Sequence, residues 1–295
     1  MADEAPMADQ AANEISRRDF VALSVAGIAA ASATASGAEV PVTETEVTIQ
    51  TPDGNCDAAF VYPSTGAHPA VIIWPDAFGL RVSMRDMAKR LAADGYTVLV
   101  PNPYYRVAKS PVFGDISHFN FANPADRNKL TPLMGSINAD GAAEKDATAF
   151  VAWLDKQQQV DTSKPIGTQG YCMGGPLVMR TAAAVPQRIG AVGSFHGGGL
   201  VTDAPNSPHL LAPKMKARLY IAVASNDDQR QPDAKDKLRD AFKKAGCPAE
   251  IEVYKSLHGW CVPDMPADAN APIYNKPEAE KAWAKLLALY KTALA

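Results

Sequence analysis

The sequence Gly170-Tyr171-Cys172-Met173-Gly174-Gly175 stands between a predicted strand, Lys164 to Thr168, and a predicted helix, Gly174 to Ala184. It matches the pattern G-x-S-x-G, in which the central residue is a nucleophile at a sharp turn between strand and helix, except that cysteine replaces serine. The glycines let the two elements approach closely, and a helix N-terminus favours a thiolate. Cys172 is therefore the candidate nucleophile. The alternative, a small buried cysteine without chemistry, leaves the flanking glycines unexplained.

Predicted strands and helices alternate along the chain on both sides of this turn. The apolar run Ala70 to Trp74 is typical of a strand buried on both faces. The alternation predicts right-handed βαβ crossovers and a mostly parallel sheet with helices on both faces, in one domain of residues 39 to 295. Together with the turn at Cys172, this predicts an α/β-hydrolase fold. The other predicted strands are Val47 to Ile49, Ala58 to Tyr62, Thr97 to Val100, Ile189 to Phe195, Arg218 to Ala224 and Glu250 to Tyr254. The other predicted helices are one from an N-cap at Ser83 to Gly95, Ala142 to Gln157, Lys235 to Ala245 and Pro277 to Leu294.

A long stretch without a regular pattern, Asn102 to Asn138, interrupts this alternation. A loop of that length inside a compact domain is usually functional or disordered. Its aromatic residues, which include Tyr104, Phe113 and Phe119, predict that it packs over the rest of the domain. Whether it acts as a lid is left open by the sequence.

Composition excludes some classes of function. The formal charge of the 295 residues is -3, and no stripe of lysine and arginine is interleaved with aromatic residues, so we expect no nucleic-acid partner. The cysteines have no C-x-x-C pair and no nearby pair of histidines, so no metal site is predicted. No disulfide is required by the sequence. The four cysteines are Cys56, Cys172, Cys247 and Cys261.

The N-terminal residues 1 to 38 are predicted to be an export signal. Arg17-Arg18 precedes a short apolar stretch, Val21 to Ala35, which ends in small residues with cleavage after Ala35 or Ala38. Paired arginines are typical of signals read by the twin-arginine export machinery, which predicts a periplasmic protein without a stable membrane span after processing. The stretch is too short and too rich in alanine and serine to be typical of a permanent membrane span. A retained membrane anchor is therefore the weaker alternative. An uncleaved tail is the other alternative.

Candidate partners for the nucleophile follow later strands. His258 comes directly after the last predicted strand, where an imidazole can accept and return a proton. An orienting acid is expected between nucleophile and base, and Asp227 or Asp228 supplies it. We favour Asp227 because it follows its strand sooner. His196 also ends a strand, and a hydrogen-bonded structural histidine is the reading we prefer over a supporting role in the site.

A hole for the negatively charged oxygen of a reacting ester needs two N–H donors. One is the N–H after the nucleophile, on Met173, and the other comes from the loop after an earlier strand. That loop contains Asp76-Ala77-Phe78-Gly79, so the second donor is the N–H of Ala77. Asp76 is expected near the thiol, although an ordinary turn aspartate is the alternative.

Together these residues resemble the dienelactone hydrolase family, also called carboxymethylenebutenolidases, over nearly all of the chain after residue 45. The resemblance implies a Cys-His-Asp triad that hydrolyses a small-molecule ester or lactone through a thioester acyl-enzyme, with no metal or organic cofactor. A general carboxylesterase or thioesterase and a non-catalytic periplasmic binding protein are the alternatives. The motifs on which the resemblance to this family rests are Gly170-Tyr171-Cys172-Met173-Gly174-Gly175, Asp76-Ala77-Phe78-Gly79-Leu80, Asp94-Gly95-Tyr96, Pro103-Tyr104-Tyr105-Arg106 and Leu257-His258-Gly259.

Two positions depart from the family's pattern. Asp76 stands where the family usually carries glutamate, a carboxylate that the resemblance implies holds and activates the thiol; aspartate is one methylene shorter. Of the two arginines that the family uses for the substrate carboxylate, Arg106 matches the first, but the second falls near Val262, which cannot donate a hydrogen bond. We therefore expect ester chemistry with a substrate that differs from the family's archetype.

Overall fold

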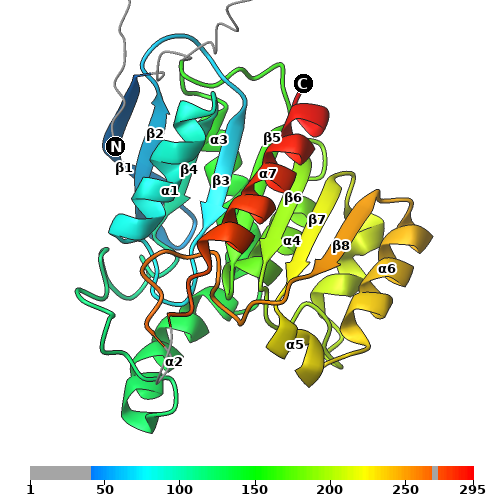
Figure 1. Cartoon of the computed structure of the whole chain (residues 1–295). Coiled ribbons are helices and arrows are strands. Elements are labelled where there is room, and N and C mark those ends of the chain that lie inside the picture. Colours follow the sequence, from blue (N-terminus) through cyan, green and yellow to red (C-terminus); the bar gives the residue numbers. More distant parts are fainter. Residues whose placement is uncertain (1–40, 268–271) are drawn as a thin grey trace, which may run out of the picture. The chain divides into compact units, whose positions relative to one another are not determined.

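An eight-stranded sheet carries the part of the chain that the computed structural model describes, residues 41–267 and 272–295 (Figure 1). The predicted export signal lies outside the described residues. The strand order is β1-β2-β4-β3-β5-β6-β7-β8. The first two pairings, β1 with β2 and β2 with β4, are antiparallel, and all the others are parallel. The strands are β1 Val42–Thr51, β2 Gly54–Pro63, β3 Ala70–Trp74, β4 Thr97–Pro101, β5 Ile166–Tyr171, β6 Ile189–Phe195, β7 Arg218–Val223 and β8 Ala249–Val253.

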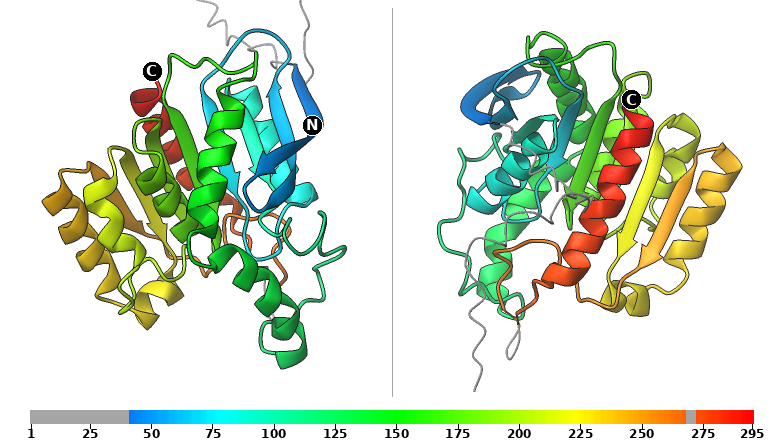
Figure 2. Two further views of the ribbon diagram at one scale, coloured as in Figure 1. Left: turned by 180° about the vertical axis from the view of Figure 1, so that it is seen from behind. Right: turned by 45° about the horizontal axis from the view of Figure 1, so that its top comes forward.

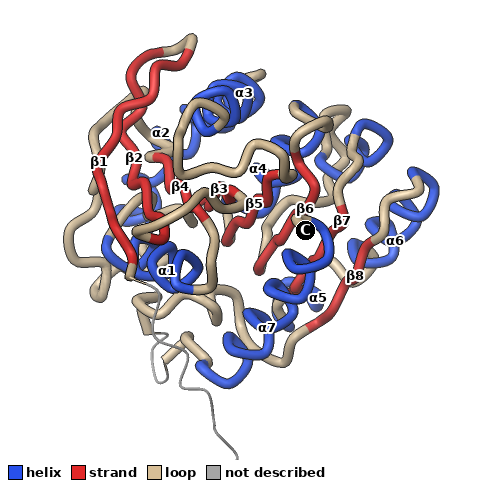
Figure 3. Tube along the Cα trace, turned by 90° about the horizontal axis from the view of Figure 1, so that it is seen from above, coloured by secondary structure: helices blue, strands red, loops and turns tan. Residues whose placement is uncertain are grey.

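Helices cover both faces of this sheet (Figures 2 and 3). On one face α1 and α7 pack against the strands, and on the other α3, α4 and α6 do so. The predicted α/β-hydrolase fold is confirmed. The helices are α1 Val82–Ala93, α2 Pro124–Asn138, α3 Ala142–Leu154, α4 Gly174–Ala184, α5 Ser225–Arg230, α6 Ala234–Ala245 and α7 Lys276–Ala293, with a 3₁₀ helix at Pro208–Lys214.

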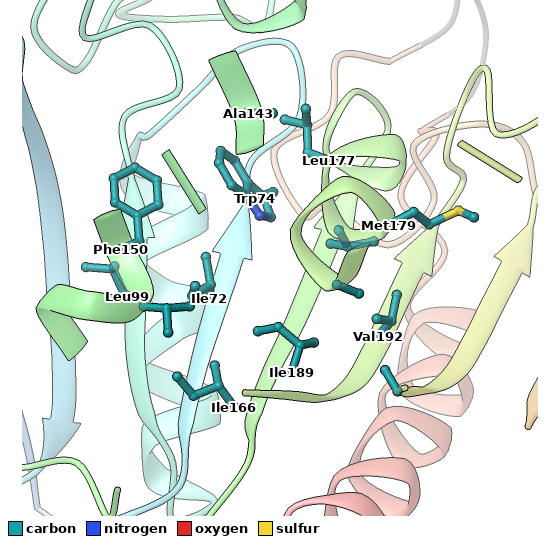
Figure 4. Close-up of a cluster of buried hydrophobic side chains, with 14 of the residues drawn as sticks. Ile72, Trp74, Leu99, Ala143, Phe150, Ile166, Leu177, Met179, Ile189 and Val192 are labelled. Atoms are coloured by element: carbon teal, nitrogen blue, oxygen red, sulfur yellow. The ribbon is translucent and has the colours of Figure 1, made fainter. Parts of the chain in front are cut away.

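The alternation of side chains along β3 divides the core into two layers. Val71 and Ile73 belong to the layer under α1 and α7, whereas Ile72 and Trp74 belong to the layer under α3 and α4. Figure 4 shows the second layer, where Phe150 of α3 lies beside Trp74 with ring centroids 5.7 Å apart. Burial on both faces explains why this strand is apolar throughout.

Two α-helices were not predicted from the sequence. The stretch Asn102 to Asn138, expected to be irregular, contains α2, which the Asn123 side chain caps by accepting the N–H of Ala125. Pro132 lies inside this helix and obscures its pattern. The short helix α5 has no buried residue, so it has no apolar face that periodicity could reveal.

The start of α1 also differs from the prediction. Its N-cap is Arg81, in an extended conformation and without a side-chain capping bond. Ser83 lies one residue inside the helix, where its hydroxyl is buried. A membrane-spanning helix would need to be longer and more apolar than any helix within the described ranges.

Candidate active site

The turn at Cys172 has the geometry of a strained strand-to-helix elbow. Cys172 follows β5, has a φ of 50°, and precedes α4. A Cβ on Gly170 would lie 2.2 Å from the carbonyl oxygen of Gly174, and one on Gly174 would lie 2.3 Å from that of Trp74. Such contacts are impossible for real atoms, so both positions require glycine. The left-handed backbone of a non-glycine residue costs free energy that the surrounding structure must supply.

His258 and Asp227 lie in contact at the carboxyl end of the sheet. Nδ1 of His258 is 2.6 Å from Oδ2 of Asp227, and the backbone N–H of His258 donates to Oδ1 of Asn226 at 2.9 Å. Asp228 instead accepts a hydrogen bond from Nζ of Lys235 at 2.6 Å. Because the strand β7 ends just before α5, the first turn of that helix presents Asp227 to the loop that carries His258. The geometry therefore favours Asp227 over Asp228 as the orienting acid.

The surroundings of His258 raise its pKa to about 10. Burial acts in the opposite direction, because it disfavours the imidazolium, but the negative charge of Cys172 and the hydrogen bond to Asp227 outweigh it. A hydrogen bond between the His258 ring and Cys172 adds to the same effect. The arrangement thus favours the protonated form of the His258 imidazole.

His196 lies behind this pair rather than in it. It is fully buried at the end of β6, has a φ of 40°, and its ring centroid is 4.8 Å from that of His258. Within the described ranges neither ring nitrogen has a hydrogen-bond partner, so the expectation of a hydrogen-bonded structural histidine is not met. Burial lowers the pKa of His196, and the neighbouring His258 lowers it further, so the ring stays neutral.

The two expected oxyanion donors lie on segments that a tyrosine connects. The hydroxyl of Tyr104 donates to the carbonyl oxygen of Ala77 at 2.7 Å and is 3.3 Å from Sδ of Met173. Neither the Ala77 N–H nor the Met173 N–H donates to a protein acceptor within residues 41–267 and 272–295. Free N–H groups are what an oxyanion hole requires. Tyr104 belongs to the sequence motif Pro103-Tyr104-Tyr105-Arg106, but its contact with both segments follows only from the fold.

Among the described residues, the Asp76 carboxylate accepts hydrogen bonds from Phe78 and Arg81 and none from the thiol of Cys172. Its carboxylate is 1% exposed, and Arg81 donates to Oδ1 and Oδ2 at 2.8 and 2.9 Å. Arg81 also donates to Oδ2 and Oδ1 of Asp264, at 2.8 and 2.7 Å, in the loop that follows His258. The arginine thus connects the oxyanion loop to the loop of the base. Neither Arg81 nor Asp264 was predicted from the sequence to belong to the site. The pattern that could have indicated Arg81 was an arginine five residues after Asp76, together with the lack of an arginine near Val262.

Arg106, predicted to bind the substrate, instead forms ion pairs with two aspartates. Its guanidinium contacts Asp146 at 2.7 Å and Asp53 at 2.8 Å, and it stacks on Tyr105 with 4.5 Å to the ring centroid. The Asp146 side chain is fully buried. Arg106 does not line the cavity beside Cys172, so the geometry gives no support to a role in substrate binding.

A cavity of about 430 Å³ opens beside Cys172. Its walls come from α2, α3, α4, the 3₁₀ helix and the segments before that helix. Met134 and Asn138 of α2 belong to it, so the stretch that follows β4 forms part of the wall. The aromatic residues of that stretch pack as predicted, since Phe113 and Phe119 both contact the ring of Phe78.

The other cysteines are unsuited to nucleophilic chemistry. Cys56, Cys247 and Cys261 are buried and free, and burial raises the pKa of each thiol. A thiol is nucleophilic only as the thiolate, so these three are unreactive at neutral pH. Cys172 is half-buried and is the free cysteine that borders the cavity.

Comparison with known proteins identifies the family of this chain. Residues 57–294 match the profile of the Dienelactone hydrolase family. The chain is 27% identical over 234 residues to the "Putative carboxymethylenebutenolidase" of Escherichia coli (strain K12), covering 77% of this chain and 78% of that one. It is 27% identical over 213 residues to the Carboxymethylenebutenolidase of Rhodococcus opacus, covering 70% and 77%.

A solved structure supports the same fold. The "Putative Dienelactone Hydrolase" from Klebsiella pneumoniae superposes with a TM-score of 0.70 at 24% sequence identity, over 85% of this chain and 99% of that chain. At this identity the likeness shows the fold alone. The family profile, in contrast, covers most of the sequence. This protein is therefore a hydrolase that belongs to the dienelactone hydrolase family.

Proposed function

We propose that this protein hydrolyses a carboxylic ester or lactone through a thioester formed on Cys172. The observation that carries the proposal is the contact of His258 with Asp227, at 2.6 Å, at the carboxyl end of the sheet, where the strained turn holds Cys172. Nucleophile, orienting acid and base follow one another in the chain order of α/β-hydrolases. Because a nucleophile with a base and an oriented third group defines covalent catalysis, the arrangement supports acyl transfer.

In the first half of the reaction the thiolate of Cys172 attacks the carbonyl carbon of the substrate. The oxygen of the tetrahedral intermediate accepts hydrogen bonds from the N–H groups of Met173 and Ala77. When the intermediate collapses, the bond from carbon to the alkoxide oxygen breaks, and the alkoxide takes a proton from the His258 imidazolium. The raised pKa of His258 ensures that this proton is present at neutral pH.

In the second half His258 acts as the base. The thioester sulfur carries no charge, so the thiolate no longer raises the pKa of His258 and the neutral imidazole is favoured. His258 removes a proton from water, the resulting hydroxide attacks the thioester carbonyl, and the bond from carbon to sulfur breaks. The products are the free acid and the thiolate, and the imidazolium is restored beside it.

Hydrolysis of p-nitrophenyl acetate tests this proposal. Cys172→Ala should reduce kcat/KM to the background rate, because all covalent chemistry depends on that sulfur. Cys247→Ala is the matched control, since it removes a thiol that lies outside the cavity, and it should retain activity wherever the protein is folded. Hydrolysis by Cys172→Ala near the wild-type rate would overturn the assignment.

We also propose export to the periplasm by the twin-arginine machinery. The support is the pair Arg17-Arg18 before the apolar stretch Val21 to Ala35, in a segment outside the described residues. Replacing both arginines by lysine keeps the charge but removes the recognised pair. Cell fractionation should then find the protein in the cytoplasm at its full length. Unchanged recovery from the periplasm would exclude this route.

A further inference from the structure

The charges around the cavity beside Cys172 are unfavourable for an anionic substrate. Of the residues that the structure describes, three with charged side chains line it: Asp140, Glu144 of α3 and Arg180 of α4. Nε and Nη2 of Arg180 donate to Oε1 and Oε2 of Glu144, each at 2.7 Å. The one arginine is therefore bound in a two-pronged ion pair, and its charge is cancelled by a group of the wall itself.

The carboxylate of Glu144 stays charged at neutral pH. Burial acts to raise the pKa of Glu144, but the hydrogen bonds and charge of Arg180, with a further contribution from the charge of Lys214, outweigh it and lower that pKa. Asp140 is exposed at the junction of α2 and α3 and forms no ion pair with any described residue. With Glu144 and Arg180 paired, Asp140 leaves this wall with an excess of one negative charge.

Among the described residues, the neighbouring cations Arg106 and Lys214 do not line the cavity. Arg106 is held by Asp146 and Asp53, and Lys214 lines a separate surface depression on the other side of the Glu144–Arg180 pair. What remains along the cavity are groups that both donate and accept hydrogen bonds, among them the amides of Asn138 and Asn206. Amides of this kind suit hydroxyl, carbonyl and carboxamide groups.

We propose that the cavity beside Cys172 takes esters or lactones whose acid portion is uncharged or cationic, and that it discriminates against a second carboxylate. This inference rests on the proposed function of Cys172. A carboxylate that entered the cavity would lose water and meet Asp140 and the Glu144 pair without an available cation. An amide or alcohol that enters the cavity loses only its hydrogen bonds to water, and the asparagine side chains replace these. The preference is therefore set by charge rather than by shape.

A charge series of p-nitrophenyl esters with one chain length tests the preference. The three probes are mono-p-nitrophenyl adipate, its terminal primary amide, and p-nitrophenyl 6-(trimethylammonio)hexanoate. Wild-type kcat/KM should be on the order of tenfold lower for the adipate than for the amide, as a like-charge penalty of about 1.4 kcal/mol implies. The cationic ester should equal or exceed the amide. A wild-type enzyme that prefers the adipate would overturn the inference.

Charge variants of the wall sharpen the test. Glu144→Gln frees Arg180 and should raise the adipate-to-amide ratio of kcat/KM, and Asp140→Asn should raise the same ratio. Glu250→Gln is the matched control, since it also breaks an ion pair, with Lys285, at the amino-terminal end of β8. The ratio compares two probes on one enzyme, so a partly unfolded variant does not distort it. An unchanged ratio in both wall variants would contradict the inference.

Binding separates this inference from the proposed function. Calorimetry of the three probes with Cys172→Ala ranks their affinities without turnover, and the adipate should bind most weakly. If that ranking is found but no probe is hydrolysed by the wild type, the catalytic proposal falls and the charge preference stands. If the probes are hydrolysed and the adipate binds best, the reverse holds.

Discussion

Both carboxylate oxygens of Asp76 are held by the two terminal nitrogens of Arg81, at 2.8 and 2.9 Å, in a setting where Asp76 is 1% and Arg81 5% exposed. Removing one partner of a buried pair leaves an uncompensated charge. Arg81→Met should therefore destabilise the protein by roughly 3–5 kcal/mol. Urea unfolding of the purified variant measures this loss.

The double variant Asp76→Asn with Arg81→Met provides the control for that prediction. It removes both charges, so it should be more stable than Arg81→Met alone. If instead the two losses simply add, the carboxylate of Asp76 does not depend on Arg81. That result would reopen the expectation that Asp76 acts on the thiol.

The pKa of His258 should depend on the charge of Cys172. With a pKa of about 10, His258 holds its proton at neutral pH and loses it only as the pH rises through that value. Acylation, which needs this proton, should decline over the same alkaline range. In Cys172→Ala the thiolate charge is gone, so the pKa of His258 should fall. NMR titration of the imidazole checks this; an unchanged pKa in the variant would argue against a thiolate beside His258.

Neighbouring aspartates should respond differently to the same substitution. Asp227→Asn removes the acceptor of the Nδ1–H of His258 and should lower kcat/KM by on the order of 10²–10⁴-fold. Asp228→Asn removes only a partly exposed contact with Lys235 and should leave activity near the wild-type value. Kinetics with p-nitrophenyl acetate compare the two. Equal losses would mean that the helix α5 as a whole, rather than Asp227, supports the base.

The glycines of the elbow should not tolerate a methyl group. Gly174→Ala places a Cβ 2.3 Å from the carbonyl oxygen of Trp74, and this overpacking should cost about 1–3 kcal/mol or more. Gly135→Ala, on an open surface of α2, should stabilise the protein by about 0.5–1 kcal/mol because alanine favours the helix. Thermal unfolding compares them. A Gly174→Ala protein as stable as the wild type would contradict the close approach of β3 and α4.

The sequence predicts the parts of this molecule that local patterns encode. The apolar run at β3 and the glycines around Cys172 follow from burial and from steric need, so the sheet and the elbow could be located. The helix α2 could not, because Pro132 interrupts its pattern and its start depends on a cap at Asn123. The six-residue helix α5 buries nothing, so no periodicity marks it.

Interactions between distant residues explain the remaining differences. Arg106 stands in a motif typical of a substrate-binding arginine, yet Asp146, forty residues later, binds its guanidinium. Glu144 and Arg180 are likewise far apart in sequence, and only the packing of α3 on α4 joins them. Charges in a sequence show which groups are present. They do not show which partner neutralises each group.

Covalent trapping of the acyl-enzyme tests the central claim most directly. The wild-type protein is mixed with p-nitrophenyl acetate, quenched in acid within milliseconds, digested and analysed by mass spectrometry. We predict one acetyl group on the peptide that contains Cys172, released by treatment with hydroxylamine, and no such group in Cys172→Ala. An acetyl group on another residue, or undiminished turnover by Cys172→Ala, would contradict the account.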